Sequence, residues 1–343
     1  MIFVTGSAGF IGSNFVLEWL SQNKEQVISY DKLTYAGNIE NLGLCIEDPR
    51  HTFIEGDISN TDKLLKIFKD FEPSFIVNFA AESHVDRSIN SPKVFFENNV
   101  IGTLGLFEAC RQYFQELSEE RKKIFRILQI STDEVYGSLS KEEDSFTEEN
   151  RFKPNSPYSA SKASSDHIAR SYYATYSLPV LISNCSNNYG PYQHPEKLIP
   201  LTILNLLRGI KVPVYGQGKQ IRDWLFVKDN CDAQMKIVKE GEIGEVYNVG
   251  GDNEKENIEV VELICEVMQA IKPSLSGSYK DLISFVGDRP GHDFRYSIDN
   301  KKISSSLNWK PSESFESGLQ KTILWYLEND LWVRKVLYKS EKS

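Results

Sequence analysis

The first half of the chain alternates short apolar runs with longer amphipathic stretches, and this alternation constrains the fold more than any other feature. Continuous apolar runs are typical of parallel strands that are covered on both faces, and helices join such strands. The runs predicted as strands are 2–5, 26–31, 52–57, 75–81, 126–132 and 179–186. The stretches predicted as helices are 10–22, 62–71, 91–117 and 156–176. The sequence therefore predicts an α/β fold with a doubly wound parallel sheet.

The pattern changes after about residue 187, where the Pro/Gly/Asn-rich segment NNYGPYQHPEK begins. Two further polar segments that contain glycine, GQGKQIRDW and GDRPGHDFR, are interpreted as loops among shorter elements. We therefore predict a first domain over 1–187 and a smaller α+β domain mainly over 188–343. The chain is expected to cross back to the first domain near 225–250.

Composition limits the classes of function. No apolar run approaches the roughly 20 residues of a membrane span. The net charge of −9 argues against nonspecific binding to nucleic acid or to a membrane surface. The five cysteines are scattered and never in CxxC spacing, which predicts reduced thiols rather than disulfides or a zinc site. Because Met1 leads almost directly into a predicted strand, we expect no signal peptide and a cytoplasmic protein without a metal site.

The segment VTGSAGFIGSNF places Gly6, Gly9 and Gly12 between the first predicted strand and the first predicted helix. Glycines there allow a sharp turn and a close approach of a pyrophosphate, to which the helix N-terminus donates. The spacing is GxxGxxG rather than GxGxxG, so a tight structural turn is the alternative. Asp31 follows about 20 residues later, where an acid can accept from the adenosine ribose and repel a 2′-phosphate. The sequence therefore predicts a Rossmann-type domain that binds NAD rather than NADP.

Two neighbouring charges bear on the adenosine site. Lys32 follows Asp31 and slightly weakens the preference for NAD. Asp57 ends the third predicted strand, where its side chain can meet the adenine edge. Capping of the following helix is the alternative interpretation of Asp57.

SPYSASKAS contains Tyr158 and Lys162, which lie four residues apart and therefore share one face of a helix. A tyrosine of ordinary pKa, about 10, is too weak a base at neutral pH. A nearby ammonium, together with a nicotinamide cation, favours the phenolate. The pair predicts hydride transfer at a carbinol, with Thr132 donating to the same substrate hydroxyl. By itself, a YxxxK pair is more often a surface feature.

Asp133 and Glu134 stand side by side where the fifth predicted strand ends, in FRILQISTDEVYGS. Adjacent carboxylates repel, so one can stay protonated while the other is ionised. Because neighbours on a strand point to opposite faces, the chain must leave strand geometry after Thr132 for both to reach one ligand. Capping of the next segment is the alternative role.

Longer motifs indicate a family. AAESHVDRS, STDEVYG, SPYSASKAS, NCSNNYGPYQHPEKLIP, QIRDW and DRPGHD resemble the dTDP-glucose 4,6-dehydratase family of the extended short-chain dehydrogenase/reductase superfamily, over roughly residues 1–328. The resemblance implies that Tyr158 takes the proton of the C4 hydroxyl while NAD takes the C4 hydride. Glu134 then removes the C5 proton, Asp133 protonates the departing C6 hydroxyl, and hydride returns to C6. The expected product is dTDP-4-keto-6-deoxyglucose.

The resemblance also implies binding residues. Those expected around the cofactor, with the glycines, Tyr158 and Lys162, are Phe10, Ile11, Asp31, Lys32, Leu33, Thr34, Asp57, Ile58, Phe79, Ala80, Ala81, Ser83, Asn98 and Asn188. Those expected around the nucleotide sugar are Ser83, Thr132, Asn187, Lys197, Leu198, Pro213, Val214, Tyr215, Arg222, Asn257, Asp288, Arg289, Pro290, Gly291 and His292. Lys197 and Arg222 suit a diphosphate, because a chain of net charge −9 needs local cations to hold a dianion. Tyr189 and Trp224 are interpreted as packing residues and His84 as structural.

Three alternatives stay open. A nucleotide-sugar 4-epimerase shares the fold and cofactor but needs no acid–base pair at C5 and C6. A dehydratase acting on a UDP-, CDP- or GDP-linked hexose keeps the chemistry and changes the nucleotide. A catalytically inactive binding protein would need none of the catalytic residues. The segments 91–117 and 156–176 exceed what one sheet face needs, so we expect a homodimer joined through a helical bundle, as the resemblance also implies.

Overall fold

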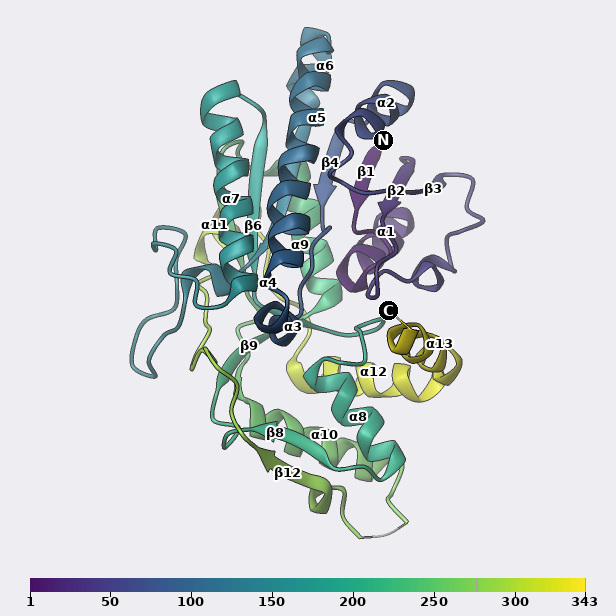
Figure 1. The fold of residues 1–343 in the computed structure, drawn as a ribbon, viewed down its shortest axis with the longest axis vertical. Coiled ribbons are helices and arrows are strands. Elements are labelled where there is room, and N and C mark those ends of the chain that lie inside the picture. The colour runs from purple at the N-terminus through teal and green to yellow at the C-terminus, as the bar shows by residue number, and fades with distance from the viewer. Residues whose placement is uncertain (276, 343) are drawn as a thin grey trace.

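Parallel strand pairing organises the larger lobe of this computed structural model, which describes residues 1–275 and 277–342 (Figure 1). Over those residues, seven strands form one sheet in the order β10–β6–β5–β4–β1–β2–β3, and each neighbouring pair is parallel. The strands are β1 (Ile2–Thr5), β2 (Val27–Asp31), β3 (His51–Glu55), β4 (Phe75–Asn78), β5 (Arg126–Thr132), β6 (Val180–Cys185) and β10 (Val246–Val249). The predicted doubly wound parallel sheet is confirmed.

Helices cover both faces of this sheet. One face carries α1 (Phe10–Gln22), α9 (Val227–Glu240) and α11 (Lys301–Leu307), and the other carries α2 (Thr61–Phe71), α5 (Gly102–Glu116) and α7 (Pro157–Tyr176). Alternate residues of a strand therefore enter two different cores. Ile2 and Val4 pack on the α1 side, whereas Phe3 packs on the α2 side. This double burial explains why the strands are continuously apolar.

The stretch predicted as one helix over 91–117 is helical from Pro92 to Glu116, but it contains a π-helical segment that was not predicted. The segment contains α4 (Pro92–Phe95), the π-helical η2 (Phe96–Ile101) and α5; α3 (Val85–Asn90) precedes it and α6 (Glu119–Ile124) follows it. Within the widened π turn, Asn99 points inward and is 1% exposed. Its amide donates to Glu82 O (3.0 Å) and to Ser161 Oγ (2.8 Å), and its oxygen accepts from Glu82 N (2.8 Å). The π turn departs from regular α-helical hydrogen bonding, and its Asn99 side chain connects η2 to Glu82 and Ser161 beside the site.

The smaller lobe packs two small sheets against helices, and it occupies the lower part of Figure 1. The sheets are β11–β9–β7 and β12–β8, with β7 (Asn187–Tyr189), β8 (Val212–Tyr215), β9 (Ile221–Phe226), β11 (Glu254–Glu256) and β12 (Ile283–Val286). The helices are α8 (Leu198–Arg208), α10 (Asn257–Ile271), α12 (Phe315–Glu328) and α13 (Asp330–Lys342), with a short 3₁₀ turn, η4 (Tyr279–Leu282). Another 3₁₀ turn, η1 (Ile39–Leu42), follows β2 and packs against α1 in the larger lobe.

In this lobe one interpretation of the sequence is wrong and another is confirmed. The QIRDW segment was expected to be a loop, but it begins β9, which is buried along its length and pairs with both β7 and β11. Tyr189 and Trp224 lie in the lobe's core at 1% and 6% exposure, which confirms them as packing residues. The chain re-enters the large sheet through α9 and β10. The domain boundary near residue 187 stays a prediction.

The described part of the chain contains no helix that is both long and apolar enough to span a membrane. All five cysteines lie in that part and form no disulfide. Among residues 1–275 and 277–342, no group of three or more His, Cys, Asp or Glu side chains is placed to hold a metal ion.

Candidate active site

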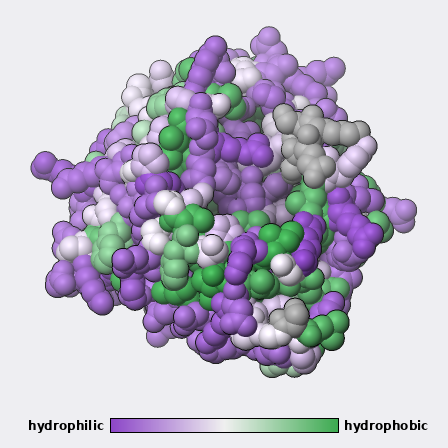
Figure 2. All heavy atoms as spheres, turned by 60° about the horizontal axis from the view of Figure 1, so that its bottom comes forward, coloured by the Kyte–Doolittle hydropathy of each residue, from purple (hydrophilic) through white to green (hydrophobic). Residues whose placement is uncertain are grey.

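The glycine loop between β1 and α1 forms the floor of two connected cavities. Gly6 has φ of +63°, and a Cβ at this position would lie 2.5 Å from Ala80 N. A Cβ at Gly12 would lie 2.2 Å from Gly6 O. These two positions therefore admit no side chain, and the N-terminus of α1 stays open toward the cavities. Figure 2 shows a central hollow with hydrophilic residues inside it.

The first cavity has the composition of an adenosine site. It is lined by Gly6, Gly9, Tyr30, Asp31, Lys32, Thr34, Ala36, Gly37, Gly56, Asp57, Ile58, Phe79, Ala80, Ala81, Glu82 and Asn98. Asp31 is anchored at the end of β2, where its two carboxylate oxygens accept from Ala8 N (2.9 Å) and Leu33 N (2.8 Å). A carboxylate has about four acceptor sites, so Asp31 can still accept from ribose hydroxyls. The predicted residue Leu33 does not line the cavity; it packs against the larger lobe's core.

Asp57 and Lys32 both line this cavity. The two side chains form an ion pair of 2.6 Å, which helps hold the pKa of Asp57 below its ordinary value. The N-cap of α2 is Asn60, which accepts from Lys63 N (3.0 Å). The alternative interpretation of Asp57 as that cap is therefore wrong, and its carboxylate faces the cavity.

The second cavity shares Gly6, Gly9, Ala36, Phe79 and Ala81 with the first, so the two can hold the two halves of one dinucleotide. Its wall brings together predicted residues from α1, β5, η3 (Asp133–Tyr136), α7, β7 and two loops, namely Phe10, Ile11, Gly12, Ser83, Thr132, Glu134, Tyr158, Lys162, Asn187, Asn188 and Lys197. These residues fit a nicotinamide and a sugar at the carboxyl edge of the sheet, where ligands of doubly wound folds bind.

The backbone leaves strand geometry immediately after Thr132, as the sequence predicts. Residues Asp133–Tyr136 form a 3₁₀ turn, η3, directly after β5. The Thr132 hydroxyl accepts from Glu134 N (3.3 Å) and donates to Asp133 Oδ1 (3.2 Å). Glu134 lines the cavity, whereas Asp133 lies deeper, at 1% exposure. Asp133 Oδ2 is buried and has no hydrogen-bond partner among the described residues.

The two acids have different electrostatic surroundings. Burial, the neighbouring Glu134 and Asp223 raise the pKa of Asp133 well above its ordinary value. Burial also raises the pKa of Glu134, but Arg222, Arg289 and Lys197 oppose that rise. Three cations therefore favour the ionised form of Glu134, while Asp133 is favoured as the neutral acid.

Tyr158 and Lys162 lie on one face of α7, as expected, and both side chains are buried. Burial and the charge of Glu134 raise the pKa of Tyr158 well above its ordinary value, and the Thr132 hydroxyl opposes this only in part. Lys162 Nζ donates to Ile130 O (2.7 Å), and burial lowers the pKa of Lys162. The protein groups alone therefore do not favour the phenolate, so a bound cation has to contribute to activating Tyr158.

Asp166 is a buried acid that the sequence analysis missed. It accepts from Ser131 Oγ (2.6 Å), and it is the principal group opposing the burial-driven fall in the pKa of Lys162. Its own pKa is raised by burial to about 7. Tyr158, Lys162 and Asp166 follow one another at intervals of four residues, so the same helical spacing could have identified the third residue.

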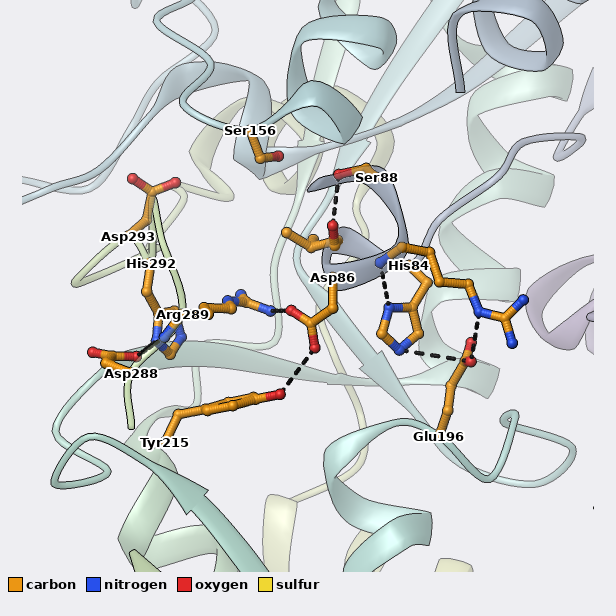
Figure 3. Close-up of polar contacts among 12 residues, drawn as sticks. His84, Asp86, Ser88, Ser156, Glu196, Tyr215, Asp288, Arg289, His292 and Asp293 are labelled. Atoms are coloured by element: carbon orange, nitrogen blue, oxygen red, sulfur yellow. Dashed lines mark hydrogen bonds and ion pairs between the residues drawn. The ribbon is translucent and has the colours of Figure 1, made fainter. Parts of the chain in front are cut away.

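Several residues predicted for the sugar nucleotide meet at α3, as Figure 3 shows. Asp86 accepts from Arg289 Nη1 (3.0 Å) and from the Tyr215 hydroxyl (3.1 Å), both of which belong to the smaller lobe. Beside them, His292 Nδ1 lies 2.6 Å from Asp288 Oδ1. Asp86 was not predicted, although it stands in the AAESHVDRS motif. It draws two predicted binding residues toward the larger lobe.

Glu196 links three segments on the other side of α3 and was also missed. Its carboxylate accepts from the Tyr35 hydroxyl (3.0 Å) and lies 3.6 Å from His84 Nε2 and 3.5 Å from Arg87 Nε (Figure 3). The adjacent Lys197 donates to Ser83 O (3.0 Å). His84 is therefore held in a polar cluster that borders the second cavity.

The remaining predicted substrate residues do not line either cavity. They are Leu198, Pro213, Val214, Tyr215, Arg222, Asn257, Asp288, Arg289, Pro290, Gly291 and His292. Val214 is 2% exposed and packs in the smaller lobe's core. Arg222 is 5% exposed and donates to the carbonyls of Ile221 (2.7 Å), Asp293 (2.9 Å) and Phe294 (3.3 Å). Its charge reaches Glu134 from behind the cavity wall.

Comparison with known proteins agrees with this arrangement. A family model described as GDP-mannose 4,6 dehydratase matches residues 3–322. A dTDP-glucose 4,6-dehydratase of Neisseria meningitidis serogroup B is 52% identical over 339 residues, which cover 98% of this chain and 96% of that protein. A dTDP-glucose 4,6-dehydratase of Streptomyces venezuelae, crystallised with NAD and TYD bound, is 43% identical with a TM-score of 0.90 and covers 98% of this chain and 99% of its own.

An epimerase is more distant. The UDP-glucose 4-epimerase of Thermotoga maritima is 26% identical with a TM-score of 0.83, covering 95% of this chain and 98% of its own. The shared fold thus extends to epimerases, but the sequence identity is 52% with the Neisseria meningitidis dehydratase and only 26% with this epimerase. The chain therefore belongs to the 4,6-dehydratase family of the matching model, and within it to the dTDP-glucose 4,6-dehydratases.

Proposed function

We propose that this protein converts dTDP-glucose to dTDP-4-keto-6-deoxyglucose with tightly bound NAD. The observation that carries the proposal is the Asp133–Glu134 pair in η3: Glu134 lines the same cavity as Tyr158, Asp133 is buried next to it, and the two acids have different electrostatic surroundings. An enzyme that only oxidises and reduces C4 has no use for such a pair. The names of the relatives and the fit of the two connected cavities to a dinucleotide support the same conclusion.

The cofactor site follows from the cavity lining. The glycine loop and the N-terminus of α1 would hold the pyrophosphate, Asp31 the adenosine ribose, and Asp57 with Ile58 the adenine. When bound, NAD supplies the oxidant for sugar C4 and the reductant for C6. A phosphate on the ribose would meet the Asp31 carboxylate, so the site favours NAD over NADP.

Tyr158 acts on the C4 hydroxyl. Its phenol oxygen accepts the hydroxyl proton, and the Thr132 hydroxyl positions the same oxygen of the sugar. Lys162, kept charged by Asp166, stabilises the phenolate together with the bound cofactor's positive charge. The resulting 4-ketone makes the neighbouring C5–H acidic, which sets up the second half of the reaction.

Glu134 and Asp133 complete the elimination of water. Glu134, held toward its ionised form by Arg222, Arg289 and Lys197, takes the C5 proton. Asp133, held neutral, gives its proton to the C6 hydroxyl, and water leaves. Glu134 then returns a proton to C5 as C6 is reduced. The cycle closes once Asp133 has regained a proton and Tyr158 has released to solvent the proton that it took from the C4 hydroxyl.

The smaller lobe is proposed to hold the sugar nucleotide. Lys197 and Arg289 lie close enough to influence Glu134 electrostatically, so they also suit the diphosphate that the sugar carries. Tyr215 and His292 stand beside Arg289 (Figure 3). The assignment of residues 188–343 mainly to substrate binding, with Leu198, Pro213, Val214, Asn257, Asp288, Pro290 and Gly291 as contacts, remains part of this proposal.

The pH dependence of turnover should be bell-shaped. Glu134 works as a base only when ionised, so the rate should fall as the pH drops through its raised pKa. Asp133 works as an acid only when protonated, so the rate should also fall as the pH rises through its own raised pKa. Measurement of kcat against pH checks both limbs. An acidic limb no higher than the ordinary glutamate value of about 4.3 would contradict the assignment of Glu134.

Product identity tests the proposed function directly. The protein, as purified and without added NAD, is incubated with dTDP-glucose and the product is identified by NMR. Dehydration gives a 4-keto-6-deoxy sugar, whereas the alternative 4-epimerase would give the C4 epimer with its C6 hydroxyl intact. An epimer as the only product would overturn the proposal.

We further propose a homodimer and a cytoplasmic location. Exposed apolar side chains occur on the neighbouring segments α4, η2, α5 and α7, and they are Val94, Phe96, Ile101, Leu104 and Tyr176. Such a surface suits a helical bundle with a second copy of the chain. The buried cysteines, none of them in a disulfide in the described chain, suit a reducing compartment.

Ile101→Glu should dissociate the dimer. Ile101 is 55% exposed and belongs to this set, so pairing two copies of the variant would bury two unpaired carboxylates. Sedimentation velocity at micromolar concentration should show a dimer for the native chain and a monomer for the variant. Ile210→Glu, at a site 49% exposed just after α8, serves as the matched control and should remain dimeric. A native chain that sediments as a monomer would exclude the proposed dimer.

A further inference from the structure

The C-terminal helix α13 (Figure 1) lies against the loop that follows β2, and its residues Trp332 and Val336 line the second cavity. Trp332 Nε1 donates to Asn41 Oδ1 (2.7 Å). Lys339 Nζ donates to the carbonyl oxygens of Leu33 (3.4 Å) and Gly37. The helix thus contacts both ends of the segment 33–42, although nearly 300 residues separate Trp332 from Asn41.

Asn41 passes this contact on to the glycine loop. Its amide nitrogen donates to Ala8 O (2.9 Å), the same oxygen that accepts from Asn38 N (2.8 Å). Ala8 N in turn donates to Asp31 Oδ2 (2.9 Å). A continuous hydrogen-bonded chain therefore runs from α13 through Asn41 to the turn that faces the cofactor pyrophosphate.

The residues of this hydrogen-bonded chain are shielded from water. Asn41 is 2% exposed and Trp332 is 8% exposed, so water does not compete for their hydrogen bond. Trp332 and Val336 themselves form part of the second cavity's wall, together with Asn38 and Asn41. Asn38 Nδ2 is a buried donor without a partner among the described residues. An unpaired donor in this wall is suited to an acceptor on a bound ligand, such as a phosphate oxygen.

We infer that Trp332 and Asn41 are positioning residues that hold the segment 33–42 and the glycine loop closed over the dinucleotide, so that α13 slows cofactor release. The inference rests on the proposed function, in which one NAD molecule must stay bound between oxidation of C4 and reduction of C6. Release requires the 33–42 segment to open, and opening breaks the bond between Trp332 and Asn41. Removing that bond removes part of the barrier to release.

Trp332→Phe tests the inference because phenylalanine keeps a ring against Tyr192 and Trp325 but cannot donate a hydrogen bond. The cofactor is measured without turnover, as the NAD retained per chain during timed dialysis of the purified protein. We expect release to be about five- to tenfold faster, the effect of one net hydrogen bond. Trp325→Phe is the matched control, since that ring packs on Trp332 at 4.9 Å from α12 but takes no part in the chain.

Asn41→Leu provides a second variant that breaks the same chain at its middle. It should release NAD at least as fast as Trp332→Phe, and the double variant should be no faster than Asn41→Leu alone, because both changes interrupt one pathway. Urea midpoints of the NAD-free proteins report any general loss of stability, which should be similar for Trp332→Phe and Trp325→Phe.

The outcomes separate this inference from the proposed function. If the native protein carries no NAD and binds none, the proposed function fails. If the native protein retains NAD and Trp332→Phe releases it at the native rate, the role of α13 is overturned while the proposed function stands. Equal acceleration by Trp325→Phe would also overturn it, because the effect would then belong to the aromatic cluster as a whole.

Discussion

Glu134→Gln is expected to lower formation of the 4-keto-6-deoxy sugar by about 10³-fold, in the range typical for loss of a general base. The amide keeps the size and the neighbourhood of the carboxylate but cannot accept the C5 proton. Oxidation at C4 does not use Glu134, so reduced nicotinamide should still appear in a single turnover and then persist. Stopped-flow absorbance follows the first step, and NMR quantifies the product.

Two comparisons sharpen this result. Glu142→Gln makes the same change at an exposed acid and should leave both steps at the native rate. Asp133→Asn should slow water loss, yet it should still allow the C5 hydrogen to exchange with deuterium from solvent, since Glu134 is intact. A Glu134→Gln protein that exchanged C5 or released product at the native rate would show that another group is the base.

Tyr158→Phe is expected to stop the reaction one step earlier, with a loss of about 10³- to 10⁴-fold in turnover. Phenylalanine fills the same space but leaves no oxygen to take the C4 hydroxyl proton. Reduced nicotinamide and the 4-keto product should both form far more slowly than with the native protein. The same stopped-flow and NMR measurements therefore distinguish this variant from Glu134→Gln, in which the first step survives.

Tyr173→Phe is the control on the same helix, because this tyrosine is 40% exposed and lies outside both cavities. It should behave like the native protein. Formation of reduced nicotinamide by Tyr158→Phe at the native rate would exclude Tyr158 as the group that activates C4.

The larger lobe was predictable because its strands are buried on both faces. Strands such as β1 carry apolar side chains toward two cores at once, so the sequence pattern needs no knowledge of the partners. The strand β9 was missed for the opposite reason. Its polar residues Arg222 and Asp223 are satisfied by carbonyl and amide groups of distant segments, which a local pattern does not reveal.

The candidate site divides in the same way. Glu134, Tyr158 and Lys162 could be predicted because a turn after β5 and one face of α7 bring them together locally. Asp86, Glu196 and Trp332 could not, since each acts through contacts across the two lobes. The π turn in η2 could not be predicted, because the stretch has the pattern of a regular helix apart from the polar Asn99.

The pKa shifts of the site residues could not be predicted without the structure. Lys162 was expected to favour the Tyr158 phenolate together with a nicotinamide cation; among the protein groups, burial and Glu134 act against the phenolate. Conversely, the cations that oppose the burial-driven rise in the pKa of Glu134 come from three separate segments, around Lys197, Arg222 and Arg289. The division of labour between the two acids therefore depends on the tertiary fold rather than on their adjacency.

Turnover of a panel of nucleotide sugars by the protein as purified, with no added NAD, tests the central claim most directly. The panel contains dTDP-, UDP-, CDP- and GDP-glucose, with the products identified by NMR. We expect dTDP-glucose to give the 4-keto-6-deoxy sugar with the highest kcat/KM. Preference for another nucleotide would correct the substrate, and failure to form a 4-keto-6-deoxy sugar from any of the four would contradict the account.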